Sequence, residues 1–277
     1  MQSLKYRNSA YLRFLRICKG KFCYLIDSLD NLHRWFFQKT SARQNILVDD
    51  SRCLHIICLK RDEYIIPTIN CVNSFWQFHP EFKVKIWCDF PRGEILRQKK
   101  GKFHRIDRVE LCQIDPLENW QENKLNIICH ELRPHDIFSD ADMFWNGRIT
   151  PSNFPLFFLR EYNLEEYATT KRLMELLKLD LKKDWFMLNV SVVNLGNLSQ
   201  NLELSKRASE IFHKIMNISQ DPVLGPSDIS KLQRTSEQLA LSISIQEKSK
   251  FSYLKETDGI MDGGIAESFY LGATRGY

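Results

Sequence analysis

The feature that most constrains the fold is Leu54–Leu59, a short and almost continuously apolar run. Such runs are typical of parallel strands that are buried on both faces of a sheet. Apolar side chains then recur at helical spacing over Ile65–Trp76. Asp62 is expected to cap this helix, and Pro67 is compatible with a first helical turn. A strand followed at once by a helix predicts an α/β domain.

The rest of the chain continues the α/β pattern. Further strands are expected at 84–88, 108–112 and 185–194, and helices at 124–131, 172–181 and 205–216. Residues 221–231 contain two prolines and a glycine, so a loop is expected there. Residues 237–246 are ambiguous, because their leucines and isoleucines alternate as in a strand while residues 235–238 form a capping box that opens a helix. Residues 258–277 show no clear period.

Asp140-Ala141-Asp142 is the only Asp-x-Asp in the chain, and it lies between apolar runs. On an extended backbone residues i and i+2 project to the same side, so the two carboxylates could converge on one ion. A hard divalent cation such as Mg²⁺ or Mn²⁺ prefers oxygen ligands and keeps positions open for substrate phosphates. Because ligands of open α/β sheets bind beyond the carboxyl ends of the strands, the motif is expected to mark a metal–diphosphate site.

Residues 1–50 are expected to form a basic helical appendage to a main domain of residues 51–277. The appendage has nine Lys/Arg and four Asp, so it holds the whole net charge of +5. Apolar side chains at three- and four-residue steps from Phe22 to Phe36 give one apolar face, beside which basic residues lie. Such a helix can attach residues 1–45 to an anionic membrane surface, or pack on its own domain or a partner subunit. The remaining chain is charge-balanced, so no nucleic-acid partner is expected.

The eight cysteines are scattered, without a Cys-x-x-Cys pair or a closed zinc pattern. Scattered cysteines in apolar surroundings favour a reducing compartment over a disulfide framework. No apolar run is long enough to cross a bilayer, and no signal peptide is evident. We therefore expect a cytoplasmic protein, with peripheral attachment to the inner membrane surface as a further expectation.

The order of these features resembles that of the GT-A nucleotide-sugar glycosyltransferases, and in particular the lipopolysaccharide galactosyltransferase/glycogenin-like family. The resemblance runs from Leu54 to Tyr277, roughly four-fifths of the chain. It implies a Rossmann-like mixed sheet flanked by helices. It also implies a hexosyltransferase-type enzyme that uses Mn²⁺ or Mg²⁺. Such an enzyme would move a sugar from a nucleotide diphosphate, most simply a UDP-sugar, to a glycan or lipid-linked hydroxyl, with retention of configuration.

The resemblance assigns donor-binding roles to five residues. Asp62 and Tyr64, which follow the first strand, would hold the uridine, with Tyr64 stacked on the base. Lys124 would face the diphosphate or the sugar. Asp140 and Asp142 would bind the metal, and Asp140 would also help to hold the ribose.

Further likenesses lie in the second half of the chain. Asn189 is similar to a residue that touches the donor sugar, and Glu237-Gln238 to an acidic–Gln pair near the anomeric carbon. Arg275 takes the place of a phosphate-binding lysine, a role that its forked donors suit.

Two positions depart from the family. Phe269 replaces a histidine that would be a third metal ligand, for which Asp262 is a nearby substitute, and Ser191 replaces a glycine. These departures favour the alternative of a catalytically inactive binding or scaffold protein with the same fold.

Overall fold

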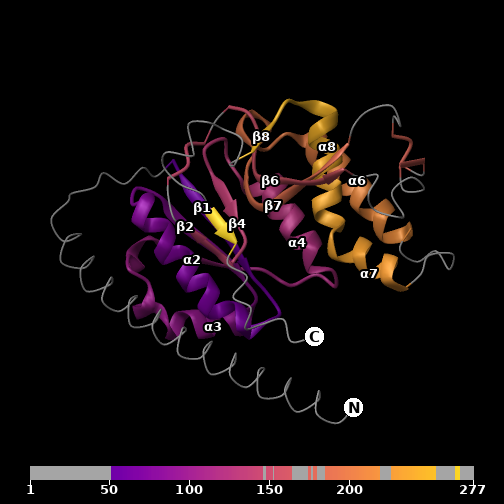
Figure 1. The fold of residues 1–277 in the computed structure, drawn as a ribbon. Coiled ribbons are helices and arrows are strands. Elements are labelled where there is room, and N and C mark those ends of the chain that lie inside the picture. Colours follow the sequence, from indigo (N-terminus) through magenta and orange to yellow (C-terminus); the bar gives the residue numbers. More distant parts are fainter. Residues whose placement is uncertain are drawn as a thin grey trace, which may run out of the picture. The chain divides into compact units, whose positions relative to one another are not determined.

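The computed structural model describes residues 51–145, 148–151, 153–163, 174–175, 177–179, 185–218, 226–253 and 266–268. All belong to one compact unit, Leu47–Tyr277. The appendage expected at residues 1–50 lies outside the described residues, as do Asp262, Phe269 and Arg275. The described part is built on a seven-stranded sheet in the order β3-β2-β1-β4-β7-β6-β8 (Figure 1).

The first half of the sheet is parallel. Its strands are β1 (Cys53–Cys58), β2 (Lys83–Cys88), β3 (Val109–Gln113) and β4 (Ile137–Ser139). They are connected by α2 (Ile65–Phe78), α3 (Phe90–Gln98) and α4 (Trp120–Asn126), which continues as a π-helical turn over Ile127–Glu131. This confirms the strands expected at 54–59, 84–88 and 108–112 and the helices expected at 65–76 and 124–131.

The second half of the sheet is mostly antiparallel. Strand β7 (Phe186–Asn194) pairs antiparallel with β4 and with β6 (Leu156–Asn163), and β8 (Ser252–Tyr253) runs parallel to β6. A small second sheet joins β5 (Met143–Trp145) to β9 (Ala266–Ser268). The helices of this half are α6 (Leu202–Ile218), α7 (Pro226–Arg234) and α8 (Ser236–Lys248). The predicted α/β class, a mixed sheet flanked by helices as in the GT-A fold, is thus confirmed.

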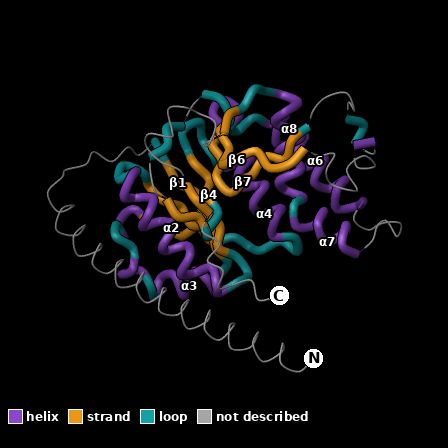
Figure 2. Tube along the Cα trace, in the orientation of Figure 1, coloured by secondary structure: helices purple, strands orange, loops and turns teal. Residues whose placement is uncertain are grey.

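Alternate side chains of β1 enter two different cores. Leu54, Ile56 and Cys58 pack with α2 and α3, whereas Ile57 and the following Leu59 pack with α4, α6 and α8. Figure 2 shows the helices on the two sides of the strands. Burial on both faces is the reason that β1 has an unbroken apolar sequence.

Two expectations for the helices near the C-terminus are corrected. The loop expected at 221–231 becomes helix from Pro226 onward, because proline is tolerated in a first helical turn; residues 221–225 lie outside the described part. The ambiguous residues 237–246 are helical, but the predicted capping box does not form. The hydroxyl of Thr235 donates to the carbonyl of Lys231 instead, in the turn that joins α7 to α8 (2.9 Å).

Several other elements differ from expectation. Asp62 does not cap α2, which begins at Ile65 without a side-chain cap. Helix α3 was not expected; it begins after Asp89, whose carboxylate accepts the Arg92 N–H (3.2 Å). Strands β5, β6, β8 and β9 were also not expected. Of the helix expected at 172–181, Met174 and Glu175 are helical, and most of the remainder lies outside the described residues. No helix in the described part has the length and apolarity needed to cross a bilayer.

Candidate functional site

The Asp-x-Asp motif lies in a turn between β4 and β5, and not on an extended strand as expected. The N–H of Met143 donates to the carbonyl of Asp140 (3.3 Å), which closes the turn. The N–H of Asp140 donates to the carbonyl of Ser191 on β7 (2.7 Å). The motif is thus fixed at the carboxyl end of β4, at the edge that the sequence predicted.

Helix α2 holds the same turn from the other side. The thiol of Cys71, on α2, donates to the Asp140 carbonyl (3.6 Å). The hydroxyl of Ser139, at the end of β4, donates to the same carbonyl (3.1 Å). Burial raises the pKa of Cys71 to about 12, so the thiol stays protonated at neutral pH. Next along the chain, the N–H of Trp145 donates to the hydroxyl of Ser74 (3.1 Å), which ties β5 to α2. Because both flanks are anchored, the two aspartates have a defined position.

A buried lysine is the centre of the site. The ammonium of Lys124, on α4, lies 2.7 Å from Asp140 Oδ1, 3.7 Å from Glu237 Oε1 and 5.4 Å from the centre of the Phe138 ring. The residue is only 3% exposed. Burial alone would lower its pKa, but the neighbouring carboxylates of Asp140 and Glu237 outweigh burial and raise it. Lys124 is therefore a fixed positive charge that joins the Asp-x-Asp turn to the start of α8.

Burial strongly perturbs the carboxyl group of Glu237. Burial raises its pKa from 4.5 to about 7, despite the opposing attraction of Lys124. Its Oε2 atom is buried and has no hydrogen-bond partner in the described part of the chain. Because buried polar atoms are nearly always paired, this oxygen is a place where a ligand hydroxyl could donate.

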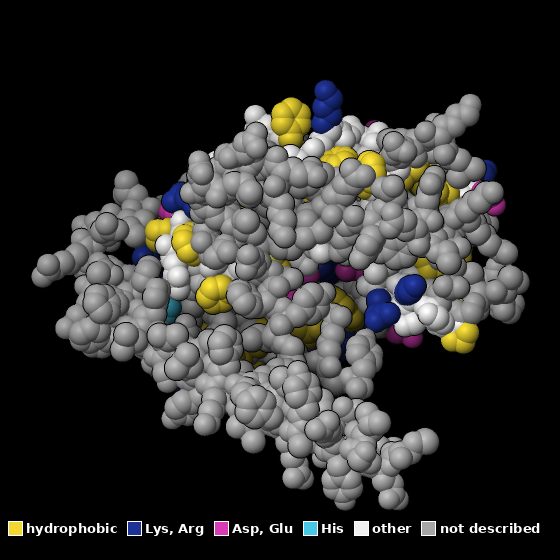
Figure 3. All heavy atoms as spheres, viewed as in Figure 1, with side chains coloured by type: hydrophobic (Ala, Val, Ile, Leu, Met, Phe, Trp, Pro, Cys, Tyr) yellow, Lys and Arg dark blue, Asp and Glu magenta, His cyan; other side chains and the backbone are white. Residues whose placement is uncertain are grey.

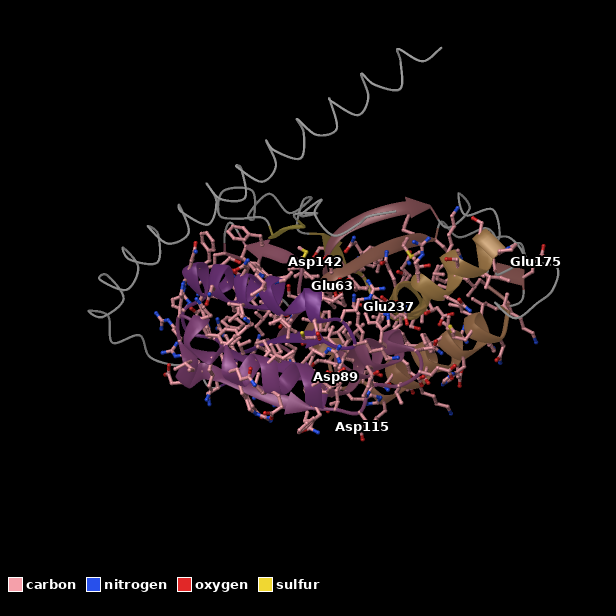
Figure 4. All side chains as sticks on the ribbon, turned by 90° about the horizontal axis from the view of Figure 1, so that it is seen from below. Glu63, Asp89, Asp115, Asp142, Glu175 and Glu237 are labelled. Atoms are coloured by element: carbon pink, nitrogen blue, oxygen red, sulfur yellow. The ribbon has the colours of Figure 1, made fainter. Side chains whose placement is uncertain are left out.

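Asp142 and Tyr64 complete the cluster. Asp142 lies on the exposed side of the turn, and Figure 4 shows it with Glu237 over the middle of the sheet, whereas Glu175 lies at one end. Tyr64 is half-buried at the start of α2. Burial raises the pKa of its hydroxyl, and the charges of Asp142 and Asp140 act in the same direction. Tyr64 is thus within electrostatic range of both aspartates.

Asp62 has a partner that the sequence did not predict. Its Oδ1 lies 2.9 Å from the guanidinium of Arg92, which also donates to the Lys60 carbonyl (3.0 Å). Buried Asp89 accepts the N–H of Lys60 (3.0 Å) and binds Arg92 as well (3.3 Å). The backbone of Lys60 has a positive φ of 62°, which is uncommon for residues other than glycine. Asp89 and Arg92 therefore fix the loop that carries Asp62 and Tyr64.

The other predicted site residues are placed as follows. Asn189 is half-buried on β7, and its side chain accepts the N–H of Ser191 (2.8 Å), the residue that binds Asp140. Gln238 follows Glu237 on α8 and is partly exposed. Arg275 lies outside the described residues. The structure thus brings together five of the predicted residues: Tyr64, Lys124, Asp140, Asp142 and Glu237. Gln238 is the next residue after Glu237, and Asn189 lies on β7, the strand that pairs with β4.

The oxygen donors of Asp140 and Asp142 are of the kind that a hard divalent cation prefers. Lys124 bonds one oxygen of Asp140, and a carboxylate has a second oxygen for an ion. Among the described residues no three His, Cys, Asp or Glu side chains converge on one point. Mg²⁺ is commonly bound by one or two carboxylates together with substrate phosphates and water, so two aspartates suffice. Figure 3 shows acidic and basic side chains of the described part next to one another on the face turned to the viewer.

A further buried acid, Asp136, stabilises the fold and lies away from the site. Asp136 lies at the amino end of β4 and accepts the N–H of Cys53 (2.8 Å) and the N–H and Nε–H of Arg133 (both 3.0 Å). Burial would raise its pKa, but hydrogen bonds from His55 and Arg133 outweigh burial and lower it. Sequence reasoning did not predict this network, because its members belong to different strands and loops.

A small cavity of about 230 Å³ lies beside α4 and is separate from the cluster. It is lined by Trp87, Ile114, Asn123, Asn126, Ile127, His130 and Glu131. None of the residues that the sequence predicted for the site contributes to it.

No protein-family model and no curated protein match this chain. Solved structures that are similar to it are glycosyltransferases, the class that the sequence resembles. Glycosyltransferase GlyE of Streptococcus pneumoniae is 9% identical over 73% of this chain, with a TM-score of 0.45. The chain spans less than half of GlyE, 45% of its length.

This chain covers a larger share of two other similar structures than it does of GlyE. LgtC galactosyltransferase, in complex with donor and acceptor sugar analogues, is 11% identical over 65% of this chain and 69% of its own, with a TM-score of 0.39. Mannosyltransferase Ktr4p of S. cerevisiae is 11% identical over 76% of this chain and 70% of its own, with a TM-score of 0.42. At these identities and scores the likeness is limited to the outline of the fold, so the function is inferred from the site itself.

Proposed function

We propose that residues 51–277 form a glycosyltransferase domain that uses a nucleotide-diphosphate sugar and a divalent cation. UDP-sugar is the proposed donor, Mn²⁺ or Mg²⁺ the proposed cation, and a hydroxyl of a glycan or lipid-linked glycan the proposed acceptor. The observation that carries the proposal is the buried Lys124, which pairs with Asp140 and Glu237 beside Asp142 at the carboxyl edge of the sheet. Ligands of open α/β sheets bind at this edge.

The charges of the cluster suit transfer from a diphosphate. When a donor sugar leaves its nucleotide, negative charge develops on the diphosphate, and fixed positive charge stabilises it. Lys124 supplies such a charge, and it also orients Asp140 by direct contact. A cation held by Asp140 and Asp142 would neutralise the leaving diphosphate further.

Glu237 is proposed to orient the sugar. Its unpartnered Oε2 could accept a hydroxyl of the donor sugar, while Lys124 holds its other oxygen. Gln238 and Asn189 would lie next to the sugar on the same side. Tyr64 would stack on the nucleotide base, with Asp62 on the same loop. Arg275 is proposed as a phosphate ligand from its position in the sequence alone. Retention of anomeric configuration follows from the family resemblance and is part of the proposal.

The experiment is a nucleotide-release assay with UDP-hexoses and GDP-hexoses, with and without Mn²⁺. Turnover is expected to require the cation and to fall at least about 100-fold in Asp142→Ala, as when electrostatic stabilisation of a leaving group is lost. Asp115→Ala is the matched control, because Asp115 is an exposed aspartate at the same edge of the sheet (Figure 4). It should release nucleotide as the wild type does.

Two outcomes would contradict the proposal. Equal turnover in Asp142→Ala and the wild type would remove the metal role of this motif. Nucleotide binding without turnover, with or without cation, would instead identify an inactive binding protein of the same fold.

We also propose a cytoplasmic location, with residues 1–45 attached to an anionic membrane surface. The support is the basic and apolar pattern of that segment. Deleting residues 1–45 should weaken sedimentation with anionic vesicles. Undiminished sedimentation of the shortened chain would contradict this part of the proposal.

A further inference from the structure

The described part has a basic edge, residues 97–108, which the proposed function does not use. The segment contains six Lys/Arg and one Asp, a net charge of +5. It begins at the last turn of α3 and continues through two 3-10 turns, Lys100–Lys102 and Ile106–Arg108, to the start of β3. Most of its basic residues are exposed or half-exposed.

The basic edge lies at the opposite side of the sheet from the candidate site. Helix α3 starts at the carboxyl end of β2 and returns the chain to the amino end of β3, because the two strands are parallel. The Asp-x-Asp turn follows the carboxyl end of β4, which is parallel to β1 and β2. The two features are therefore separated by the length of the strands.

Among the described residues, Arg97 is the one member of the basic edge whose ion pair is with a neighbouring acid, Glu94. The three lysines of the edge form no ion pair within the described part of the chain. Arg105 and Arg108 both donate to the carbonyl of Pro80, an acceptor without net charge. The pKa of Arg105 is lowered by burial and by the adjacent charge of Arg108. The edge thus has a surplus of positive charge that an anionic partner could neutralise.

The charge of residues 51–277 is unevenly distributed along the sequence. The chain has a net charge of +5, and residues 1–50 account for all of it, so residues 51–277 are balanced. Because residues 97–108 carry +5, the other residues of the domain carry −5. Five aspartates lie at the carboxyl edge: Asp62, Asp89, Asp115, Asp140 and Asp142. Asp62 and Asp89 share the single charge of Arg92, and Asp140 pairs with Lys124. A charged surface would orient such a domain with the basic edge toward negative charge.

We propose that the basic edge of residues 97–108 docks on an anionic lipid surface. Lysines near anionic headgroups gain attraction from the surface potential without a fitted pocket. Ile106, which is 39% exposed between the basic residues, adds an apolar contact. Phe103 is the one Phe, Tyr or Trp of the segment and is buried, so the edge lacks the exposed large aromatic side chains on which successive nucleic-acid bases stack. Docking in this way would turn the acidic edge, with Lys124 and Asp140, away from the lipid.

The test is sedimentation of the full chain, and of the chain without residues 1–45 because that segment is proposed to bind the same surface, with vesicles of phosphatidylcholine and phosphatidylserine at about two to one. The variant is Lys99→Gln/Lys100→Gln/Lys102→Gln. Each lysine near an anionic surface changes partitioning about fivefold, so the triple variant should bind about 100-fold more weakly. The control Lys206→Gln/Lys214→Gln/Lys231→Gln removes three exposed lysines of α6 and α7 and should bind as the wild type does. Higher salt should weaken wild-type binding.

Three results would overturn the proposal. In the first, the variant sediments like the wild type. In the second, the control loses as much binding as the variant, which would show dependence on net charge alone. In the third, the variant loses affinity for a single-stranded RNA while its vesicle binding is unchanged, which would assign the edge to nucleic acid. Unchanged thermal midpoints would show that both sets of substitutions leave the fold intact.

Discussion

Replacing Glu237 with glutamine is expected to stabilise the protein at neutral and alkaline pH while it impairs the site. The wild-type carboxyl is buried, and its pKa is raised from 4.5 to about 7. Between these two values the folded state holds a proton that the unfolded state has released. The stability of the wild type therefore falls as pH rises through this window. Glutamine resembles the protonated carboxyl and does not titrate, so the variant lacks this loss.

The magnitude follows from the shift. A shift of 2.5 units, from 4.5 to about 7, corresponds to about 3 kcal/mol at about 1.4 kcal/mol per unit. The variant should match the wild type near pH 4.5. Above pH 4.5 the free energy of unfolding of the variant should exceed that of the wild type by about 1.4 kcal/mol more for each pH unit. The difference should level off near about 3 kcal/mol above pH 7. A stability cost of this size in the wild type is typical of a residue kept for activity.

The assay is urea unfolding at pH 5, 6, 7 and 8, followed by fluorescence. The matched control is Glu247→Gln, at the exposed end of the same helix, where Glu247 pairs with Arg207 (2.8 Å). The two side chains of this pair are 25% and 26% exposed, so its loss should lower stability by about 1 kcal/mol, and by the same amount at each of the four pH values. A difference between Glu237→Gln and the wild type that is independent of pH would refute the reasoning. So would a variant that is less stable than the wild type at pH 8.

Three further substitutions test other parts of the structure. Lys124→Met should lower the free energy of unfolding by about 3–5 kcal/mol at pH 8, because it leaves two carboxylates without their buried partner. A decrease of less than about 1 kcal/mol in urea unfolding would contradict this. Asp136→Asn should cost about 3 kcal/mol at pH 7. Because the folded pKa of Asp136 is lowered, that cost should shrink as pH falls below about 4, and a constant difference in acid unfolding would be inconsistent with it. Arg92→Leu should weaken UDP binding about tenfold in calorimetry by releasing the loop of Asp62 and Tyr64, whereas unchanged affinity would separate that loop from the nucleotide.

The sequence predicted the elements whose apolar pattern is local. Strand β1 is buried on both faces, so its apolar run is unbroken, and α6 shows a regular apolar stripe. The position of Asp140 and Asp142 at the end of a central strand also followed from local pattern. Helix α3 was missed because its nine residues include Pro91 and Gly93 and bury only one side chain, that of Leu96.

What could not be predicted depends on contacts between distant segments. Lys124 and Glu237 are more than one hundred residues apart, and only the sheet order brings α4 and α8 together. The same holds for Arg92 with Asp62, and for β9 with β5. Sequence spacing also favoured an extended Asp-x-Asp, whereas the Ser191 carbonyl, the Cys71 thiol and the end of pairing at Ser139 fold it into a turn.

The central claim is that the Asp-x-Asp turn binds nucleotide and metal together. The most direct measurement is the thermal midpoint of the full chain with UDP, with and without Mn²⁺, for the wild type and for Asp140→Ala/Asp142→Ala. A ligand that binds only the folded state raises the midpoint by mass action. We predict a rise with UDP that requires Mn²⁺ in the wild type and is lost in the double variant. An equal rise in both proteins, or a rise that is independent of Mn²⁺, would contradict the account.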